Sequence, residues 1–120
     1  MPYSIPMPED EEERVKNLEE YNIMDTAPEM VFDEITELAA EILQCPVTTI
    51  QFLHEDRQWF KSKYGLPDDM IETPRDMALC SHTICQNDLL LVPDTTKDER
   101  FSDHGSVTSE PNVRFYAGMP

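Results

Sequence analysis

Residues 47–66 constrain the fold of this chain more than any other stretch, because their pattern predicts a β-hairpin. Residues 47–53 are rich in β-branched and aromatic side chains, which suit a pleated surface. The polar residues 54–57 have the length of a hairpin connection. Residues 58–64 form the return strand, which Gly65 ends. We therefore expect the helix before this hairpin and the loops after it to pack on the sheet that it forms.

Two helices are predicted before the hairpin. The first spans residues 9–21 and carries only a thin apolar stripe. The second follows Thr26 and Glu29, whose spacing is that of a capping box, and runs to about Gln44. Its glutamates at 34, 37 and 41 are expected to face away from the sheet. Its apolar stripe, which is expected to face the sheet, consists of Val31, Ile35, Leu38 and Ile42.

The part of the chain after the hairpin alternates short elements with polar loops. The pattern predicts a loop over 66–76, a short helix ending at Gln86, a strand over 89–92, a capped turn over 94–101 and a strand over 112–117. The whole order predicts an α+β fold with a mainly antiparallel sheet, with helices on one face and loops over the other.

The domain organisation is predicted to be simple. Residues 1–8 contain three prolines and are expected to form a disordered lead-in. Residues 9–120 have the length of one domain. No internal repeat separates them further.

Charge excludes some partners. The chain has 25 acidic and 9 basic residues, a formal net charge of −16. Such a surface repels phosphates, so nucleic acid and anionic membranes are not expected partners. The sequence has no apolar run near the roughly 20 residues of a spanning helix and no signal-peptide pattern. Three cysteines at irregular spacing indicate a reducing, cytoplasmic location.

Eight short stretches, in order along the chain, match a known family. They are YNIMDTAPE (21–29), FD (32–33), EDRQWFKS (55–62), ETPRD (72–76), CSH (80–82), VPD (92–94), DERF (98–101) and RFYAG (114–118). With them the chain resembles a GAF domain, of the subgroup at the N-terminus of bacterial sensor histidine kinases and diguanylate cyclases. The resemblance implies a cytoplasmic, non-catalytic module that senses a small molecule or relays a signal. It also implies a homodimer or a downstream signalling domain as partner.

The resemblance also implies that the last strands of such a domain are missing here. A domain of this family continues past Gly118 into two more strands and a C-terminal helix, whereas this sequence stops at Pro120. The edge of residues 47–53 is then expected to be unpaired. Open edges recruit other strands, so we expect a chain of this extent to be poorly stable, swapped or dimeric.

Six polar residues are the candidates for orienting a ligand beneath the loops. They are Arg75, Cys80, His82, Asp94, Arg100 and Tyr116. Each also has a structural interpretation. Arg75 could anchor its loop through Asp76, Asp94 could cap a turn that buries Phe101, and Tyr116 could simply be exposed. The ligand and any cofactor are not identified by the sequence.

Cys80, His82 and Cys85 allow other chemistry. On a helix, Cys80 and His82 lie about 200° apart, so a metal site is not expected. Some relatives of the fold attach a bilin to a cysteine, but the motif is unclear here and a tetrapyrrole is not expected. The main alternative is a thiol-based redox enzyme or switch of the methionine sulfoxide reductase type that uses Cys80 or Cys85. A third possibility is an empty dimerisation scaffold. No catalytic residue is assigned.

Overall fold

The computed structural model describes residues 5–120 and has an α+β fold whose strands pair antiparallel, as the sequence predicts. The chain divides into two compact units. The hairpin unit comprises Glu12–Thr73, and the loop unit comprises the chain up to Glu11 together with Pro74–Pro120. The expected lead-in falls partly outside the described residues, and residues 5–8 belong to no helix or strand. Within residues 5–120, no helix is long and apolar enough to span a membrane.

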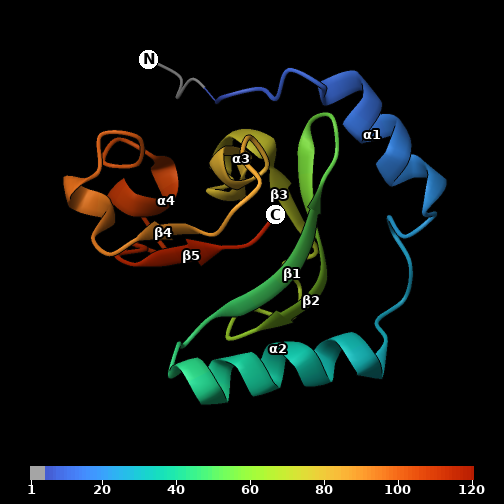
Figure 1. The fold of residues 1–120 in the computed structure, drawn as a ribbon. Helices are drawn as coiled ribbons and strands as arrows, with labels where there is room; N and C mark the ends of the chain where they lie inside the picture. The colour runs from blue at the N-terminus through green and yellow to red at the C-terminus, as the bar shows by residue number, and fades with distance from the viewer. Residues whose placement is uncertain (1–4) are drawn as a thin grey trace. The chain divides into compact units, whose positions relative to one another are not determined.

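The hairpin unit holds the longest elements of the chain (Figure 1). Its elements are α1 (Glu11–Glu20), α2 (Met30–Leu43), β1 (Thr48–Leu53), β2 (Arg57–Tyr64) and the short β3 (Glu72–Pro74). The first residue of α1, Glu11, and the last residue of β3, Pro74, belong to the loop unit. The strands form a sheet in the order β1-β2-β3. β3 corrects the prediction of a continuous loop over 66–76. A three-residue strand carries too little pattern to be recognised from sequence.

The predicted hairpin is confirmed, with His54 N–H donating to the Arg57 carbonyl at the turn. Among the described residues β1 pairs only with β2, so the expected open edge is present. The register shifts where Ile50 faces Ser62 but Gln51 faces Phe60, so Lys61 is the extra residue of a β-bulge. A bulge re-aims side chains, and here Lys61 and Ser62 both reach α2 or the segment that leads into it.

Lys61 fastens the start of α2 to the sheet. Its ammonium group is fully buried and donates to the Thr26 hydroxyl at 2.8 Å and the Ala27 carbonyl at 2.7 Å. It also pairs with Glu29 at 2.7 Å and lies over the Phe32 ring. These contacts satisfy a buried charge that would otherwise be costly.

The helix begins later than the capping box predicts. α2 starts at Met30, and Glu29 is its N-cap residue, without a side-chain cap. The Thr26 hydroxyl instead donates to the Ile23 carbonyl and accepts from Lys61. The capping-box prediction is therefore wrong, because the Thr26 hydroxyl is hydrogen-bonded to Lys61 of β2 instead of to the start of α2.

α2 packs on the sheet through a face that the sequence does not single out. Its buried residues are Thr36 and Ala40, and its apolar stripe is exposed. The Thr36 hydroxyl lies 2.9 Å from the Ser62 hydroxyl, which donates to Asp33, and the Thr36 carbonyl accepts from Thr48. The expectation that the stripe of Val31, Ile35, Leu38 and Ile42 faces the sheet is therefore wrong. The glutamates at 34, 37 and 41 are exposed, as expected.

This packing predicts that a threonine matters more than a leucine in α2. Thr36→Val keeps the shape of the side chain but leaves the buried Ser62 hydroxyl with one bond fewer, so we expect a loss of about 1–2 kcal/mol of unfolding free energy. Leu38→Ala removes an exposed side chain and should change stability by less than about 0.5 kcal/mol. Urea unfolding of both variants measures the difference. The opposite ranking would show that the stripe faces the core.

α1 is attached to the tip of the hairpin. Val15 and Leu18 are its buried residues. Arg14 donates to the Leu53 carbonyl, and Glu19 accepts from His54 at 3.0 Å. The first helix is thus confirmed, and Val15 and Leu18 of its thin stripe are buried.

The loop unit is built from short elements around a small core. Its elements are η1 (Arg75–Met77), α3 (Cys80–Thr83), β4 (Leu90–Val92), η2 (Thr95–Lys97), α4 (Gly105–Thr108) and β5 (Tyr116–Gly118). β4 and β5 pair as a separate two-stranded sheet. The core consists of Leu79, Leu90, Val92, Phe101 and Val107.

Two predicted boundaries in this unit are wrong. α3 ends at Thr83, because the amides of Cys85 and Gln86 bond carbonyls three residues back and tighten the chain. The strand expected over 112–117 is only β5, because Asn112 has a positive φ of 57° and Val113 and Arg114 bond to Ser106 and Thr95 instead of to a strand.

Candidate functional site

The candidate site of the loop unit is centred on the ring of Phe101, which is 0% exposed. The His82 ring meets it edge to face, with 4.6 Å between the ring centroids. The Tyr116 ring lies 6.2 Å away, and the Arg100 guanidinium lies 5.3 Å from the centroid of the Phe101 ring. α3, the turn that holds Arg100 and Phe101, and β5 therefore bring three of the candidate residues to one aromatic ring. We call His82, Arg100, Phe101 and Tyr116 the Phe101 cluster.

Tyr116 is held by α3. Its hydroxyl lies 2.7 Å from the Thr83 hydroxyl. Burial raises the pKa of Tyr116, and the nearby Cys80 adds to this effect. The phenol therefore stays protonated at neutral pH and can donate or accept a hydrogen bond. Gly118 permits this arrangement, because a Cβ there would lie 2.3 Å from the Tyr116 oxygen.

Arg100 is oriented by Asp98. The guanidinium donates to both carboxylate oxygens, at 3.0 and 2.7 Å, and the Arg100 amide donates to the same carboxylate. The hydrogen bond with Arg100 lowers the pKa of Asp98. The Arg100 side chain is 46% exposed, so a fixed cation faces solvent at the edge of the cluster.

His82 is neutral at neutral pH. Partial burial lowers its pKa, Arg100 lowers it further, and Asp98 opposes the shift. A neutral imidazole has one donor and one acceptor nitrogen. The cluster can therefore offer a cation, an imidazole and a phenol to a compact polar ligand.

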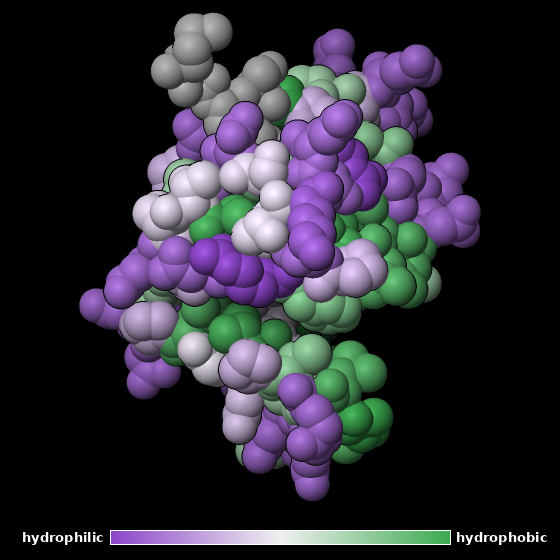
Figure 2. All heavy atoms as spheres, turned by 90° about the vertical axis from the view of Figure 1, so that its left-hand side faces the viewer, coloured by the Kyte–Doolittle hydropathy of each residue, from purple (hydrophilic) through white to green (hydrophobic). Residues whose placement is uncertain are grey.

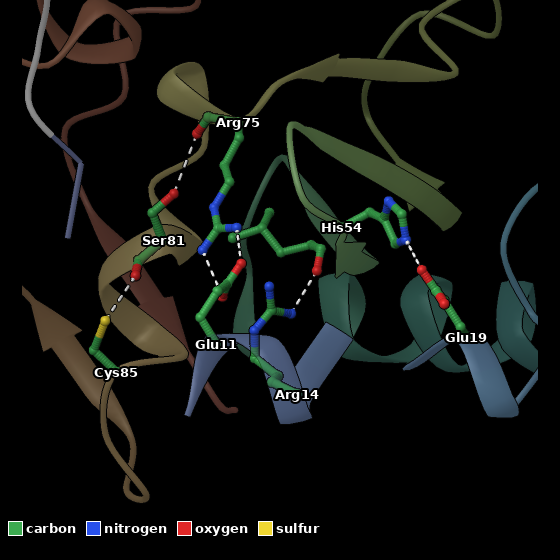
Figure 3. A network of polar contacts seen from close by, with 8 residues as sticks. Glu11, Arg14, Glu19, His54, Arg75, Ser81 and Cys85 are labelled. Carbon is green, nitrogen blue, oxygen red and sulfur yellow. Dashed lines mark hydrogen bonds and ion pairs between the residues drawn. The ribbon is translucent and has the colours of Figure 1, made fainter. Parts of the chain in front are cut away.

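Arg75 lies outside the Phe101 cluster and has a structural contact. It is 2% exposed, and its guanidinium donates to both carboxylate oxygens of Glu11, one of them at 3.1 Å (Figure 3). Its carbonyl accepts from the Ser81 hydroxyl at 3.1 Å. The sequence allowed an anchor through Asp76, whereas the carboxylate that the structure places at the guanidinium is that of Glu11.

Asp94 also has a structural contact. Its carboxylate accepts from the Thr96 amide at 3.0 Å and the Thr96 hydroxyl at 2.6 Å, which caps η2. These bonds, chiefly that from the hydroxyl, lower the pKa of Asp94. The predicted capped turn is confirmed.

The two cysteines near α3 differ in exposure. Cys80 is buried, whereas Cys85 is exposed and its thiol donates to the Ser81 carbonyl at 3.3 Å (Figure 3). Across residues 5–120, no three His, Cys, Asp or Glu side chains are grouped so that they could hold a metal ion.

His104 is a buried histidine that the sequence reasoning missed. It is 0% exposed, and its Nδ1 accepts from the Ser106 amide at the start of α4, so a neutral ring carries its proton on Nε2. Burial lowers its pKa, His82 lowers it further, and the Ala78 backbone and Asp76 oppose the shift. His104 has no motif around it, so no sequence signal could have identified it.

These two histidines predict that the protein loses stability in mild acid. Their pKa values in the folded chain lie below the ordinary 6.5, so below pH 6.5 the unfolded chain binds protons that the folded chain does not. The free energy of unfolding should therefore fall as the pH drops through about 6.5 to 5, by at most about 1.4 kcal/mol per pH unit for each histidine.

A variant separates His104 from other titrating groups. His104→Asn keeps an oxygen that can cap α4 and removes the imidazole. Urea unfolding between about pH 5 and pH 7 should show a clearly flatter pH dependence for this variant. An unchanged slope would assign the pH dependence to groups other than His104.

Comparisons with known proteins support the family that the sequence motifs indicate. The family model described as GAF domain matches residues 27–120. Among curated proteins, the chain is 37% identical over 115 residues to a cyclic di-GMP phosphodiesterase of Pseudomonas aeruginosa. The match covers 96% of this chain but 19% of the relative, so the chain spans about a fifth of that protein.

Proposed function

Because the chain belongs to the GAF domain family, we propose that it is a non-catalytic input module that binds a small molecule at the Phe101 cluster. The observation that carries this proposal is the cluster itself. Arg100 is oriented by Asp98, His82 is neutral, and Tyr116 is a protonated phenol, all around one buried ring. Ligand sites are usually apolar pockets with a few converging polar groups, and the Phe101 cluster supplies such polar groups.

The cysteines support a binding role over a thiol enzyme. A reactive cysteine needs an accessible thiolate beside a cation or a base. Cys80 is buried, and the Cys85 thiol points at a backbone carbonyl. Neither arrangement favours nucleophilic attack on a substrate.

The output of the module lies in a further domain. The relative that matches this chain over 19% of its length is a cyclic di-GMP phosphodiesterase. We therefore place the module before an output domain that makes or breaks a cyclic dinucleotide, or before a histidine kinase, in a cytoplasmic protein that works as a homodimer. The sequence motifs favour the same setting.

A thermal-shift screen tests the proposed binding. Nucleotides, amino acids and tetrapyrroles are added to the purified chain, and the melting temperature is measured. A ligand that binds only the folded state stabilises it by about 2.7 kcal/mol at a hundredfold excess over its Kd. We expect at least one such ligand, and we expect His82→Ala and Arg100→Ala to reduce the shift.

Lys97→Ala is the matched control, because Lys97 is an exposed cation of the same unit outside the Phe101 cluster. It should leave the ligand shift unchanged. A screen without a hit would favour an empty scaffold. Methionine sulfoxide reduction that is lost in Cys80→Ser or Cys85→Ser would show that the chain is a redox enzyme and not a binding module.

A further inference from the structure

The Tyr116 hydroxyl is hydrogen-bonded to a residue that is not among the candidates from the sequence. It lies 2.7 Å from the hydroxyl of Thr83, the last residue of α3. Thr83 is 3% exposed, so water cannot easily compete for this bond. The Tyr116 side chain also packs against the core of the loop unit. Thr83 therefore fixes the position of the phenol in the Phe101 cluster.

Gly118 leaves the space that this hydroxyl pair occupies. A Cβ at Gly118 would lie 2.3 Å from the Tyr116 oxygen and 2.7 Å from the Thr83 oxygen, closer than side-chain atoms pack. The φ of Gly118 lies outside the left-handed region, so close approach and not backbone conformation requires the glycine. The backbone of β5 thus lies directly against the hydroxyl pair.

The hydroxyl pair has one proton more than its hydrogen bond uses. Each hydroxyl carries one proton, and the bond between them uses one of the two. Within residues 5–120, neither hydroxyl is hydrogen-bonded to any other group. The pair can therefore donate a second hydrogen bond, to an acceptor atom of a ligand. The guanidinium of Arg100 in the same cluster also only donates, so both groups favour an anionic oxygen.

The side of the chain that carries α4 and β4 in Figure 1 faces the viewer in Figure 2. Hydrophobic spheres show there in small patches between hydrophilic ones. Polar and apolar groups are thus interleaved on this side. A compact ligand that carries an anionic oxygen on an apolar body can contact groups of both kinds.

We propose that Thr83 and Gly118 are positioning residues of the Phe101 cluster, and that the Thr83–Tyr116 pair donates its second hydrogen bond to a carboxylate or phosphate oxygen of the ligand. This inference rests on the proposed function, because it names the ligand class of the same site. Thr83 acts by holding the Tyr116 hydroxyl. Gly118 acts by leaving both hydroxyls their space.

A measurement without ligand tests the role of Thr83. The tyrosines are isotopically labelled at Cζ, and the NMR signal that disappears in Tyr116→Phe belongs to Tyr116. Thr83→Val removes the hydroxyl with little change of shape and should shift the Tyr116 signal. Thr83→Ser keeps the hydroxyl, so its Tyr116 signal should stay near the wild-type position. Loss of packing alone would not restore the signal in the serine variant.

The same signal tests the role of Gly118. Gly118→Ala should shift it, because the added Cβ overlaps the Tyr116 hydroxyl and displaces it. Gly105→Ala is the matched control in the same unit. A Cβ there would meet the end of the Met77 side chain, which is flexible and can move away. The Tyr116 signal of this control should keep its wild-type position.

Three small probes test the ligand class. Acetate, inorganic phosphate and methylammonium are titrated at equal ionic strength. Acetate or phosphate should perturb the Tyr116 signal with a Kd of about 1–10 mM, and the tighter of the two identifies the carboxylate or the phosphate as the preferred group. Methylammonium, which only donates, should not perturb it. Thr83→Val should raise the Kd of the anion about tenfold, and Thr83→Ser by less than about twofold.

Each part of the proposal has a result that overturns it. An unchanged Tyr116 signal in Thr83→Val and Gly118→Ala would overturn the positioning role. Equal effects of methylammonium and the anions, or no effect of any probe, would overturn the ligand class. The ligand-free signal can be interpreted even if the thermal-shift screen gives no hit. A screen ligand that stabilises the wild type and Thr83→Val equally would support the binding module and overturn the role of Thr83.

Discussion

Phe101→Ala should lower the free energy of unfolding by about 3–5 kcal/mol, the cost of emptying a buried aromatic site. Phe101 is fully buried among Leu79, Leu90, Val92 and Val107. Its loss also removes the ring that His82 and Tyr116 pack against. A marginally stable chain would lose most of its stability with this one change. Urea unfolding followed by circular dichroism measures the effect.

Phe115→Ala is the matched control for this prediction. Phe115 belongs to the same unit and is 49% exposed, so its truncation should cost less than about 1 kcal/mol. Similar losses for the two variants would mean that Phe101 is not the centre of the core. The Phe101 cluster would then lack the rigid ring on which the proposed site depends.

Glu11→Ala should cost about 3–5 kcal/mol, because it leaves the buried guanidinium of Arg75 without its carboxylate. Arg75 is 2% exposed, so water cannot easily replace the lost partner. Thermal melting measures the effect. Adding Arg75→Met to Glu11→Ala should recover part of the loss, because the buried charge is then removed as well.

Glu12→Ala provides the control for Glu11→Ala. Glu12 is the next acidic residue of α1 and is exposed. Its removal should change stability by less than about 0.5 kcal/mol. If Glu11→Ala melts at the temperature of the wild type, the Arg75 pair contributes nothing, and the acidic start of α1 is only a solvated surface.

Local signals in the sequence predicted much of the fold. The hairpin was predictable because β-branched residues and a short polar connection lie next to each other in the chain. The cap of η2 was predictable because Asp94 and Thr96 are two residues apart. The order of helices and strands, and hence the α+β fold with antiparallel pairing, followed from such short-range patterns.

The face that α2 buries was not predictable from its pattern. The sequence favours the stripe of Val31, Ile35, Leu38 and Ile42, because apolar side chains usually face a core. The structure instead buries Thr36 and Ala40, and Thr36 is held by a hydroxyl of β2. The bulge at Lys61 that turns Ser62 and Lys61 toward α2 has no sequence signature. A polar contact between elements thus decided the orientation of the helix.

Short motifs in the sequence identify only part of the candidate site. His82, Arg100 and Tyr116 meet around Phe101, and Cys80 lies near Tyr116. The sequence makes Arg75 a candidate ligand residue, but the structure pairs it with Glu11, 64 residues away. No spacing rule connects residues so distant. Short motifs identified which residues are unusual, and only the fold decides which of them meet.

If a small molecule binds at the Phe101 cluster without being converted, an NMR titration of the isotopically labelled chain should show it. The titrant is the ligand found by the thermal-shift screen. We expect the perturbed amide signals to centre on His82, Arg100, Phe101 and Tyr116, and the ligand's own signals to stay constant over time. Perturbations confined to other residues, or steady consumption of the ligand, would contradict it.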